Sequence, residues 1–338
     1  MWAIPGRMIA LVFVIALLFL PLITTSPYIV RLATLTAIWA IFAASWDVLA
    51  GFTGQLNLGQ ALFFGVAAYI AAFLNLHLSL APWATIPIGA LAAVTVGLIV
   101  AIPAMRVRGF YLALVTLAFP IILLGIIDAF PDITGGEFGL AGISRLSESK
   151  ILDYYIIVLV MAVCVFLMWK LTDTGSKSVR LGVILRAINE DEIAARAAGI
   201  NTVRYKLLAF SISGFFAGIA GGLYAHVFRI VGPSTLLIWT SFYPIMWTIF
   251  GGIGTIYGPV TGAFILYPLV DALGIVAESY RLLIFAILVI VILLVMPEGL
   301  TVWFRDKIER VCPRCGLINI TTRRTCRACG AMLHFERE

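Results

Sequence analysis

The chain has 338 residues, of which 62% are hydrophobic and 12% are charged, and its formal net charge is +6. Soluble domains carry about 25% charged residues, so this composition excludes a soluble globular protein. Apolar runs of about 20 residues recur, and this is the length that a helix needs to cross the hydrocarbon core of a membrane. Because backbone groups in lipid must pair within the protein and strand-like alternation is absent, we expect these runs to be helices and not the strands of a barrel.

We predict an all-α polytopic membrane protein with about ten transmembrane helices. The expected spans are residues 8–24, 29–50, 58–76, 83–104, 111–130, 152–171, 207–228, 236–252, 257–276 and 281–297. The first run lacks a convincing small-residue cleavage site, so we expect a retained span and not a signal peptide. The segment from Gly251 to Gly258 fits either a plain loop or a re-entrant turn. We divide the chain into a membrane domain, residues 1–300, and a tail, residues 301–338.

The basic residues are distributed unevenly over this topology. With an even number of spans both termini lie on one side of the membrane, and most of the basic residues fall on that side. The positive-inside rule identifies it as the cytoplasmic side. Membrane orientation thus accounts for the positive charge, and no nucleic-acid partner is expected. The prediction is a multi-pass protein of the cell (plasma) membrane, surrounded by lipid, with both termini cytoplasmic.

Two glycine-rich segments stand far apart in the chain, at residues 51–60 and 251–262. Both open with glycines three apart, so a two-repeat architecture of the kind found in transporters is one interpretation of the pattern. Glycine at this density permits close helix packing or an unwound backbone. Gln55, Asn57 and Gln60 stand where lipid-facing helices carry Leu or Val. Two interpretations are open for these amides: they line a wet path, or they form hydrogen bonds between helices.

The sequence contains no recognisable catalytic site and no nucleotide-binding motif. Four acidic residues lie close to the ends of predicted spans, where we expect them to be solvated: Asp47, Asp128, Asp271 and Glu278. No span carries a series of acids and histidines that would form a proton relay. The stretch from Thr174 to Ser178 lacks the spacing of a phosphate-binding loop. We therefore expect that the chain is not an enzyme, and that any nucleotide supplying energy binds to another chain.

The loop between the sixth and seventh spans, residues 172–206, contains the most polar helix-like segment of the membrane domain. We predict one amphipathic helix here, with Asn189 as its N-cap, Glu192 three residues later, and Gly199 as its C-terminal stop. A polar helix held at a membrane surface is suited to contact a soluble partner, and the alternative is a merely solvated connector. The candidate contact residues are Glu190, Asp191, Glu192, Ala195 and Gly199.

The tail contains four of the five cysteines, arranged as Cys312-Pro-Arg-Cys315-Gly and Cys326-Arg-Ala-Cys329-Gly. Two C-x-x-C pairs, each followed by glycine, are able to place four thiolates around one Zn²⁺ ion. A cytoplasmic location favours reduced thiols over disulfides. We predict a small zinc ribbon over residues 312–330 with a structural Zn²⁺ ion, and disulfides or free thiols are the alternative.

Five segments form an ordered set of motifs: GFTGQLNLGQA at 51–61, AMRVRGFYLALVTLAF at 104–119, TGG and GLAGI within 134–143, GGIGT with GP within 251–259, and PEGL at 297–300. In this order they resemble the permease subunits of branched-chain amino acid ABC importers of the LivM type. The loop segment 190–201 resembles the ATPase-contact segment of that family. The resemblance runs from about residue 28 to residue 300 and leaves out the cysteine-rich tail.

The resemblance implies a transport subunit that pairs with a second homologous permease subunit, two ATPase subunits and an extracellular solute-binding protein. ATP hydrolysis is then expected on the partner ATPase subunits, with no nucleotide on this chain. The expected substrates are branched-chain or other amino acids, and urea or short amides are the alternative. A stand-alone secondary transporter or channel and a membrane-embedded enzyme are the competing classes.

A translocation path is expected along the two glycine-rich segments. The candidate path residues are Gly54, Gln55, Asn57, Gly59, Gln60, Tyr243, Gly251, Gly252 and Gly254. The sequence departs from the family at three of these positions. Gln60 stands where a histidine is common, Asn57 replaces a usual serine, and Tyr243 stands where the family tends to have an acid. These departures leave the identity of the substrate open.

Overall fold

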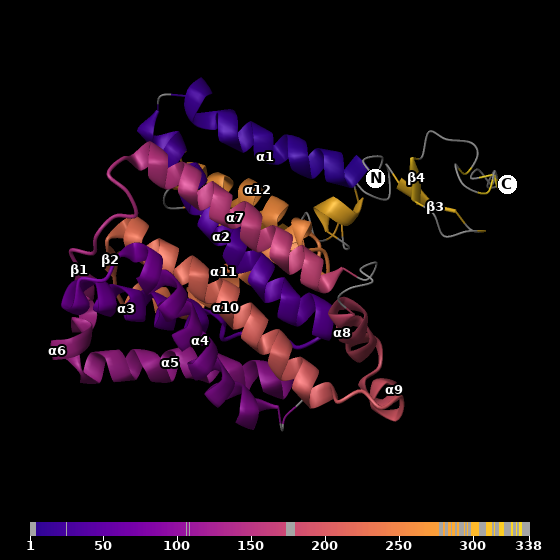
Figure 1. Ribbon diagram of the computed structural model, residues 1–338, viewed down its shortest axis with the longest axis horizontal. Helices are drawn as coiled ribbons and strands as arrows, with labels where there is room; N and C mark the ends of the chain where they lie inside the picture. The colour runs from indigo at the N-terminus through magenta and orange to yellow at the C-terminus, as the bar shows by residue number, and fades with distance from the viewer. Residues whose placement is uncertain are drawn as a thin grey trace.

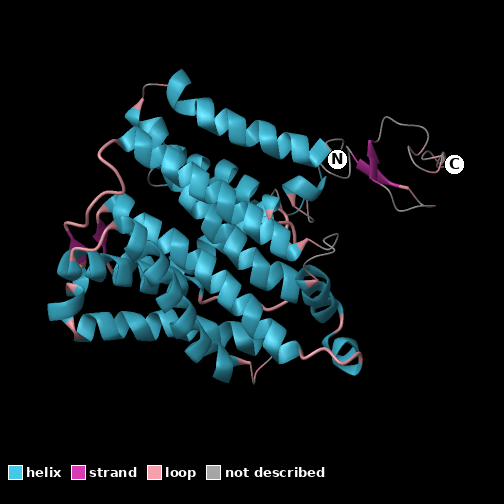
Figure 2. Ribbon diagram, viewed as in Figure 1, coloured by secondary structure: helices cyan, strands magenta, loops and turns pink. Residues whose placement is uncertain are grey.

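The computed structural model describes residues 5–24, 26–105, 107, 109–173 and 180–276, and shorter stretches between residues 280 and 332. Long helices packed side by side dominate it (Figures 1 and 2). The long helices are α1 (Pro5–Ile23), α2 (Pro27–Thr53), α3 (Gln60–Leu78), α4 (Pro82–Ala104), α5 (Phe110–Ala129), α7 (Lys150–Thr172), α10 (Thr202–Phe228), α11 (Ile238–Gly251) and α12 (Tyr257–Val276). The shorter elements are α6 (Pro131–Thr134), η1 (Gly136–Phe138), β1 (Leu140–Ala141), α8 (Leu181–Glu190), α9 (Glu192–Ala197), β2 (Ile230–Val231), η2 (Pro233–Leu236), β3 (Glu309–Val311) and β4 (Ile318–Ile320).

Seven of the described helices are long and apolar enough to cross a membrane: α2, α3, α4, α5, α7, α10 and α12. They coincide with seven of the predicted spans, so the prediction of an all-α polytopic membrane protein is confirmed. Helix α1 coincides with the predicted span 8–24, although its described apolar part, Phe13–Ile23, is shorter than the others. The predicted span 281–297 falls mostly on residues outside the described part of the chain.

Helix α11 is shorter than the predicted span 236–252. Its 14 residues extend for about 21 Å, less than the roughly 30 Å of a hydrocarbon core. The difference arises because Leu236 ends the 3₁₀ turn η2 and Leu237 is extended, with ψ of 152°, so the helix begins only at Ile238. The segment after α11 is a tight turn into α12: a Cβ atom at Gly251 would lie 1.9 Å from the carbonyl oxygen of Gly258, so glycine is required for this close approach.

Helix α2 lies at the centre of the bundle, where it packs against α7, α10, α11 and α12. Its apolar window is 89% buried, a larger share than in any other candidate span, so α2 faces protein on nearly all sides. The ring of Trp39 stacks on that of Phe64 in α3, with 5.4 Å between the ring centroids. A movement of α2 must therefore be shared by several neighbouring helices.

Helices α3, α4 and α10 form a second closely packed group. A Cβ atom at Gly221 in α10 would lie 2.1 Å from the carbonyl oxygen of Phe64, and one at Gly89 in α4 would lie 2.7 Å from that of Ala67. Small residues at such crossings let helix backbones approach each other, which favours helix association in a membrane.

The two ends of the bundle differ in structure (Figure 1). At one end, β1 and β2 pair antiparallel, with Leu140 opposite Val231, and we call this the β1–β2 end. At the other end lie α8 and α9, and we call this the α8–α9 end; α1 begins on the same side. Strands β3 and β4 form a separate antiparallel hairpin outside the helix bundle.

Candidate functional site

The polar loop forms two short helices, α8 and α9, and not the single helix predicted from the sequence. The chain leaves helical geometry at Asp191, where φ is −152° and ψ is 104°. The carboxylate of Asp191 accepts hydrogen bonds from the backbone N–H groups of Ile193 (2.8 Å) and Ala194 (3.0 Å), which makes Asp191 the N-cap of α9. The predicted N-cap, Asn189, lies inside α8. That prediction was wrong because the amide of Asn189 bonds to α2 instead of to its own helix.

The end of α9 follows the prediction that Gly199 is a C-terminal stop. Gly199 has φ of +85°, and its N–H donates to the carbonyl oxygen of Arg196 at 2.9 Å. The N–H of Ile200 donates to the carbonyl oxygen of Ala195 at 3.1 Å. This pair of hydrogen bonds is a Schellman motif, in which glycine takes the left-handed position. Because both of its ends are capped, α9 is a short helix with well-defined limits.

Glu192 attaches α9 to α10. Its carboxylate pairs with Lys206 at 2.8 Å and with Arg196, and it accepts a hydrogen bond from the hydroxyl of Thr202 at 3.1 Å. Burial acts to raise the pKa of Glu192, but the hydrogen bonds from Lys206 and Arg196 outweigh it and lower the pKa from 4.5 to about 2. Glu192 is therefore ionised over the whole physiological pH range.

Helix α8 is amphipathic, and its apolar face packs against α2, α7 and α10. The buried residues of that face are Gly182, Leu185 and Ile188. At the last turn of α8, Nδ2 of Asn189 donates to the carbonyl oxygen of Gly51 at 3.1 Å. Gly51 is among the last residues of α2, whose carbonyl groups have no partner within the helix. The side chain of Asn189 thus caps the C-terminal end of α2 from another helix.

Arg186, also in α8, makes a second contact near the C-terminal end of α2. Its guanidinium carbon lies 5.3 Å from the ring centroid of Phe52, and its Nη2 atom lies 3.5 Å from the carbonyl oxygen of Gly254. A cation is favourable at the C-terminal end of α2, where the helix dipole concentrates partial negative charge. Helix α8 therefore contacts both glycine-rich segments, the first at Gly51 and the second at Gly254.

Asp47 joins the two glycine-rich segments inside the bundle. Its side chain is fully buried, and Oδ1 accepts a hydrogen bond from the N–H of Gly254 at 2.8 Å. The prediction that Asp47 is solvated was wrong, because the turn after α11 covers this part of α2. A Cβ atom at Gly51 would lie 2.2 Å from Oδ1 of Asp47 and 2.6 Å from the nitrogen of Gly254. Glycine at position 51 is what lets the turn reach the carboxylate.

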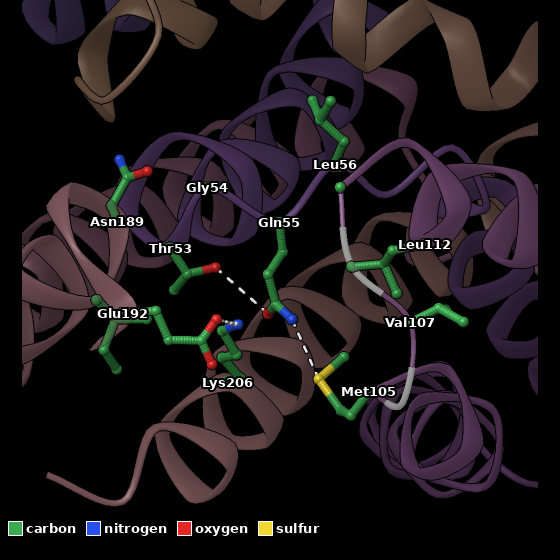
Figure 3. Close-up of a pocket in the computed structure, with 12 residues that line it drawn as sticks. Thr53, Gly54, Gln55, Leu56, Met105, Val107, Leu112, Asn189, Glu192 and Lys206 are labelled. Atoms are coloured by element: carbon green, nitrogen blue, oxygen red, sulfur yellow. Dashed lines mark hydrogen bonds and ion pairs between the residues drawn. The ribbon is translucent and has the colours of Figure 1, made fainter. Parts of the chain in front are cut away.

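A pocket of about 240 Å³ lies next to Asn189 and the C-terminal end of α2 (Figure 3). Its lining residues are Thr53, Gly54, Gln55, Leu56, Met105, Val107, Gly109, Leu112, Ile188, Asn189, Glu192 and Lys206. Within it, Gln55 Oε1 accepts a hydrogen bond from Thr53 at 3.4 Å, and Nε2 lies 3.1 Å from Sδ of Met105. The candidate path residues Gly54 and Gln55 thus share one pocket wall with the candidate contact residue Glu192.

The amides of Asn57 and Gln60 lie in a buried hydrogen-bond network and are not among the residues lining this pocket. Asn57 Nδ2 donates to Gln60 Oε1 at 2.8 Å. Gln60 Nε2 donates to the hydroxyls of Ser45 in α2 (3.0 Å) and Ser213 in α10 (3.1 Å). The network therefore links α2, α3 and α10. In this conformation Asn57 and Gln60 therefore form hydrogen bonds between helices, which is the second of the two interpretations given for them above.

The other candidate path residues fall in separate places. Gly251 is the last residue of α11, and Gly252 follows it as the C-cap before the turn into α12. Gly59 precedes α3, and its N–H donates to Oδ1 of Asn57 at 2.9 Å. Tyr243 belongs to an aromatic cluster, where its ring stacks on that of Trp247 with 5.5 Å between centroids. Of the candidate path residues, Gly54 and Gln55 line the pocket described above, and the others are not among its lining residues.

Residues 28–293 match the protein family described as "Branched-chain amino acid transport system / permease component". The chain belongs to this family. Membership agrees with a bundle of apolar helices that presents a polar loop at one end. The matched region stops before the cysteine pairs, so the tail lies outside it.

Similar proteins have names that agree with this family. The chain is 29% identical, over 309 residues, to the high-affinity branched-chain amino acid transport system permease protein LivM of Escherichia coli (strain K12), with 83% of this chain and 71% of the relative covered. It is 28% identical, over 283 residues, to the probable branched-chain amino acid transport permease protein LivH of Methanocaldococcus jannaschii, with 77% and 87% covered. No solved structure matches the chain.

The tail of this permease-family chain brings together three of its four candidate metal ligands. The sulfur atoms of Cys312, Cys326 and Cys329 lie within 4.8 Å of one another, and Cys315 lies outside the described residues. The sulfur atoms of Cys312 and Cys329 are 3.5 Å apart, well beyond the ~2.05 Å of a disulfide. Sulfur ligands of a tetrahedral Zn²⁺ ion with Zn–S of about 2.3 Å lie about 3.8 Å apart. The described thiols therefore fit a zinc site.

Sequence reasoning missed that Asp47, Gly51 and Arg186 all meet at Gly254. One signal was present: Asp47 and Gly51 are four residues apart, so they share a face of one helix. A carboxylate beside a glycine inside an apolar span indicates that another backbone approaches there. No sequence pattern identifies Gly254 as that backbone, because its proximity depends on how α11 and α12 pack against α2.

Proposed function

We propose that this chain is the transmembrane permease subunit of an ATP-binding-cassette importer for branched-chain amino acids. The family match over residues 28–293 carries the proposal, and relatives named for branched-chain amino acid transport supply the substrate class. The chain would act with a second homologous permease subunit, two ATPase subunits and an extracellular solute-binding protein. ATP hydrolysis takes place on the ATPase subunits.

Helices α8 and α9 form the surface that contacts the ATPase in this proposal. They lie at one end of the bundle, and Glu190 and Asp191 are exposed there. The Asp191 cap, the Schellman motif at Gly199 and the ion pairs of Glu192 give α9 a defined shape, so that a push on it reaches α10 without first unfolding the helix. The α8–α9 end then faces the cytoplasm, together with both termini.

The substrate path runs along the glycine-rich segments, with Gly54 and Gln55 at its cytoplasmic mouth, where the pocket of about 240 Å³ lies. Asn57 and Gln60 bond to each other and to two neighbouring helices. Their amides are the polar groups that a path would expose when α2, α3 and α10 separate.

Uptake by the complete complex in proteoliposomes tests the proposal. We expect ATP-dependent uptake of leucine, isoleucine or valine that requires both the ATPase subunits and the solute-binding protein. Uptake of urea or acetamide alone would favour the alternative substrate class. Uptake that proceeds without ATPase subunits would overturn the proposal in favour of a stand-alone transporter.

We further propose that Cys312, Cys315, Cys326 and Cys329 hold one structural Zn²⁺ ion in the cytoplasmic tail. The proximity of three of the four sulfur atoms and the hairpin of β3 and β4 that leads into Cys312 support it. Four protein ligands leave no open coordination position, so the ion would stabilise the fold of the tail and take no part in catalysis.

Elemental analysis of the purified full-length chain tests the metal site. We expect about one zinc per wild-type chain and a loss of most of it in the Cys312→Ser variant. The matched control is Cys164→Ser, because Cys164 is buried in α7, outside the tail, and this variant should retain the metal. Wild-type protein without zinc, or a Cys312→Ser variant with full zinc, contradicts the assignment.

A further inference from the structure

The last turn of α8 meets the central helix α2 at its C-terminal end. The N–H of Gly54 bonds to the carbonyl oxygen of Ala50 at 3.1 Å, and the next carbonyl, that of Gly51, accepts from Asn189 Nδ2 at 3.1 Å. A Cβ atom at Gly54 would lie 2.4 Å from Oδ1 of Asn189. The Asn189 amide therefore bonds to the backbone of Gly51 and lies against Gly54, where a side chain would displace it, while a side chain at Gly51 would displace Asp47 and Gly254.

Two side chains contact Gly254, in the turn after α11, one at its N–H group and one at its carbonyl oxygen. Asp47 of α2 accepts a hydrogen bond from the N–H of Gly254 at 2.8 Å. Arg186 of α8 approaches the carbonyl oxygen of Gly254 at 3.5 Å. An acid on α2 and a base on α8 therefore approach opposite ends of one residue.

Asp47 retains spare hydrogen-bonding capacity at this point. Its Oδ2 atom is buried and has no hydrogen-bond partner among the described residues. A buried polar oxygen without a partner is costly, so Oδ2 has capacity for one further hydrogen bond.

We infer that Asn189 and Arg186 transmit movement of α8 into α2 and the α11–α12 turn, and that Asp47 keeps those two segments moving together. The inference rests on the proposed function, in which the ATPase pushes on α8 and α9. It identifies three positioning residues, which act through the backbone of glycines and do not touch the substrate. Because α2 packs against α7, α10, α11 and α12, a displacement of its end is passed to most of the bundle.

The test compares ATP hydrolysed per substrate molecule transported in proteoliposomes of the complete importer. Losing one hydrogen bond of ordinary strength corresponds to a factor of about five in an equilibrium, so Asn189→Ala should raise this ratio by about that factor while the complex still assembles. Arg186→Met, which keeps a side chain over Phe52, should raise it too. Asp47→Asn combined with Asn189→Ala should give less than the product of the two single effects, because residues in one network are not independent.

The matched control is Asn75→Ala. Asn75 also donates from Nδ2 to a backbone carbonyl, that of Leu80, at 2.8 Å, but it lies toward the β1–β2 end, next to Ser144. It should leave the ratio at the wild-type value even where it lowers uptake. A wild-type ratio in Asn189→Ala and Arg186→Met, with normal assembly, overturns the inference alone. A wild-type complex without ATP-driven uptake overturns both the proposed function and the inference.

A second readout separates transmission from simple stabilisation. Hydrogen–deuterium exchange at the C-terminal end of α2 should change when ATP binds to the wild-type complex. In Asn189→Ala the same amides should respond weakly to ATP, while their exchange without ATP stays close to that of wild type. An undiminished response to ATP in this variant contradicts transmission through Asn189.

Discussion

Helices α8 and α9 belong to one loop, yet different chemistry attaches them to the bundle. Helix α8 lies on α2 through an apolar face and through contacts from Asn189 and Arg186 to backbone carbonyl groups. Helix α9 is attached to α10 through the carboxylate of Glu192, which pairs with Lys206 and Arg196. Ion pairs near a surface are weakened by salt and lost when the carboxylate is protonated, whereas amide-to-carbonyl contacts are much less affected.

The difference divides the loop into two parts. Helix α8 bonds to the backbone of α2 at Gly51 and lies against Gly54, where a Cβ atom would overlap Asn189. Helix α9 is held to α10 by charges at the edge of the bundle, so its attachment weakens with salt and acid. In an importer, such a loop would combine an adjustable contact for the ATPase with a fixed connection to the membrane helices.

The largest effect should follow from filling the space at Gly51. In Gly51→Ala the new Cβ atom overlaps Oδ1 of Asp47 and the nitrogen of Gly254, and we expect a loss of stability of about 1–3 kcal/mol together with a loss of uptake. The control is Gly125→Ala in α5, where a Cβ atom meets nothing within 4 Å and the change should be neutral or stabilising by about 0.5–1 kcal/mol. Thermal unfolding in detergent measures both. Equal melting temperatures for the two variants would contradict the close contact at Gly51.

The contrast between α8 and α9 also shows which features of the chain are predictable from the sequence alone. The membrane spans, the stop at Gly199 and the cysteine pairs depend on local composition and spacing, and they were predictable. The break at Asp191 was not, because Asn189 and Asp191 are both good capping residues, and the choice between them depends on whether Asn189 finds a partner on α2. The burial of Asp47 likewise depends on a turn about 200 residues away in the chain.

Path residues were the least predictable. Glycines and amides in apolar spans indicate close packing or a wet path with equal weight. The structure places Gly54 and Gln55 in a pocket, Asn57 and Gln60 in a buried network, and Tyr243 in an aromatic cluster. Composition identifies glycines and amides in apolar spans, but it does not show which of them line the same cavity.

Reversing the charge of Glu192 should act on α9 and leave α8 in place. In Glu192→Lys, three cations come together beside α10, and we expect a local destabilisation of α9 by about 1–2 kcal/mol. Uptake should fall, while the melting temperature of the bundle stays close to that of wild type. Glu190→Lys is the matched variant, because Glu190 is exposed at the end of α8; it should lower uptake only through the contact with the ATPase. Wild-type uptake in both variants would argue against any role of this loop in coupling.

A smaller and more local effect is expected at Gly199. Its φ of +85° costs an ordinary L-residue about 1–2 kcal/mol, and no atom lies within 4 Å of a Cβ atom there. Gly199→Leu should therefore loosen the end of α9 by strain alone and reduce coupling without unfolding the bundle. Gly199→Asn should be milder, because asparagine tolerates left-handed geometry. Hydrogen exchange of the α9 amides measures the difference, and identical exchange in the two variants would show that backbone strain is not the cause.

The smallest effect at ordinary pH, and the one that separates the two helices most cleanly, is their response to acid. The pKa of Glu192 is lowered from 4.5 to about 2 in the folded chain, so its attachment of α9 is fully present above about pH 4.5 and is lost as the pH falls toward 2. The contacts of α8 come from Asn189, which does not titrate, and Arg186, which stays charged. A spin label at the exposed Ile193 of α9 should gain mobility between pH 4.5 and 2, and one at the exposed Val183 of α8 should not. Glu192→Gln should show a mobile α9 at neutral pH and a smaller further change in acid, because the Asp191 cap is still present, and an acid transition of the same size in that variant would assign the effect to another group.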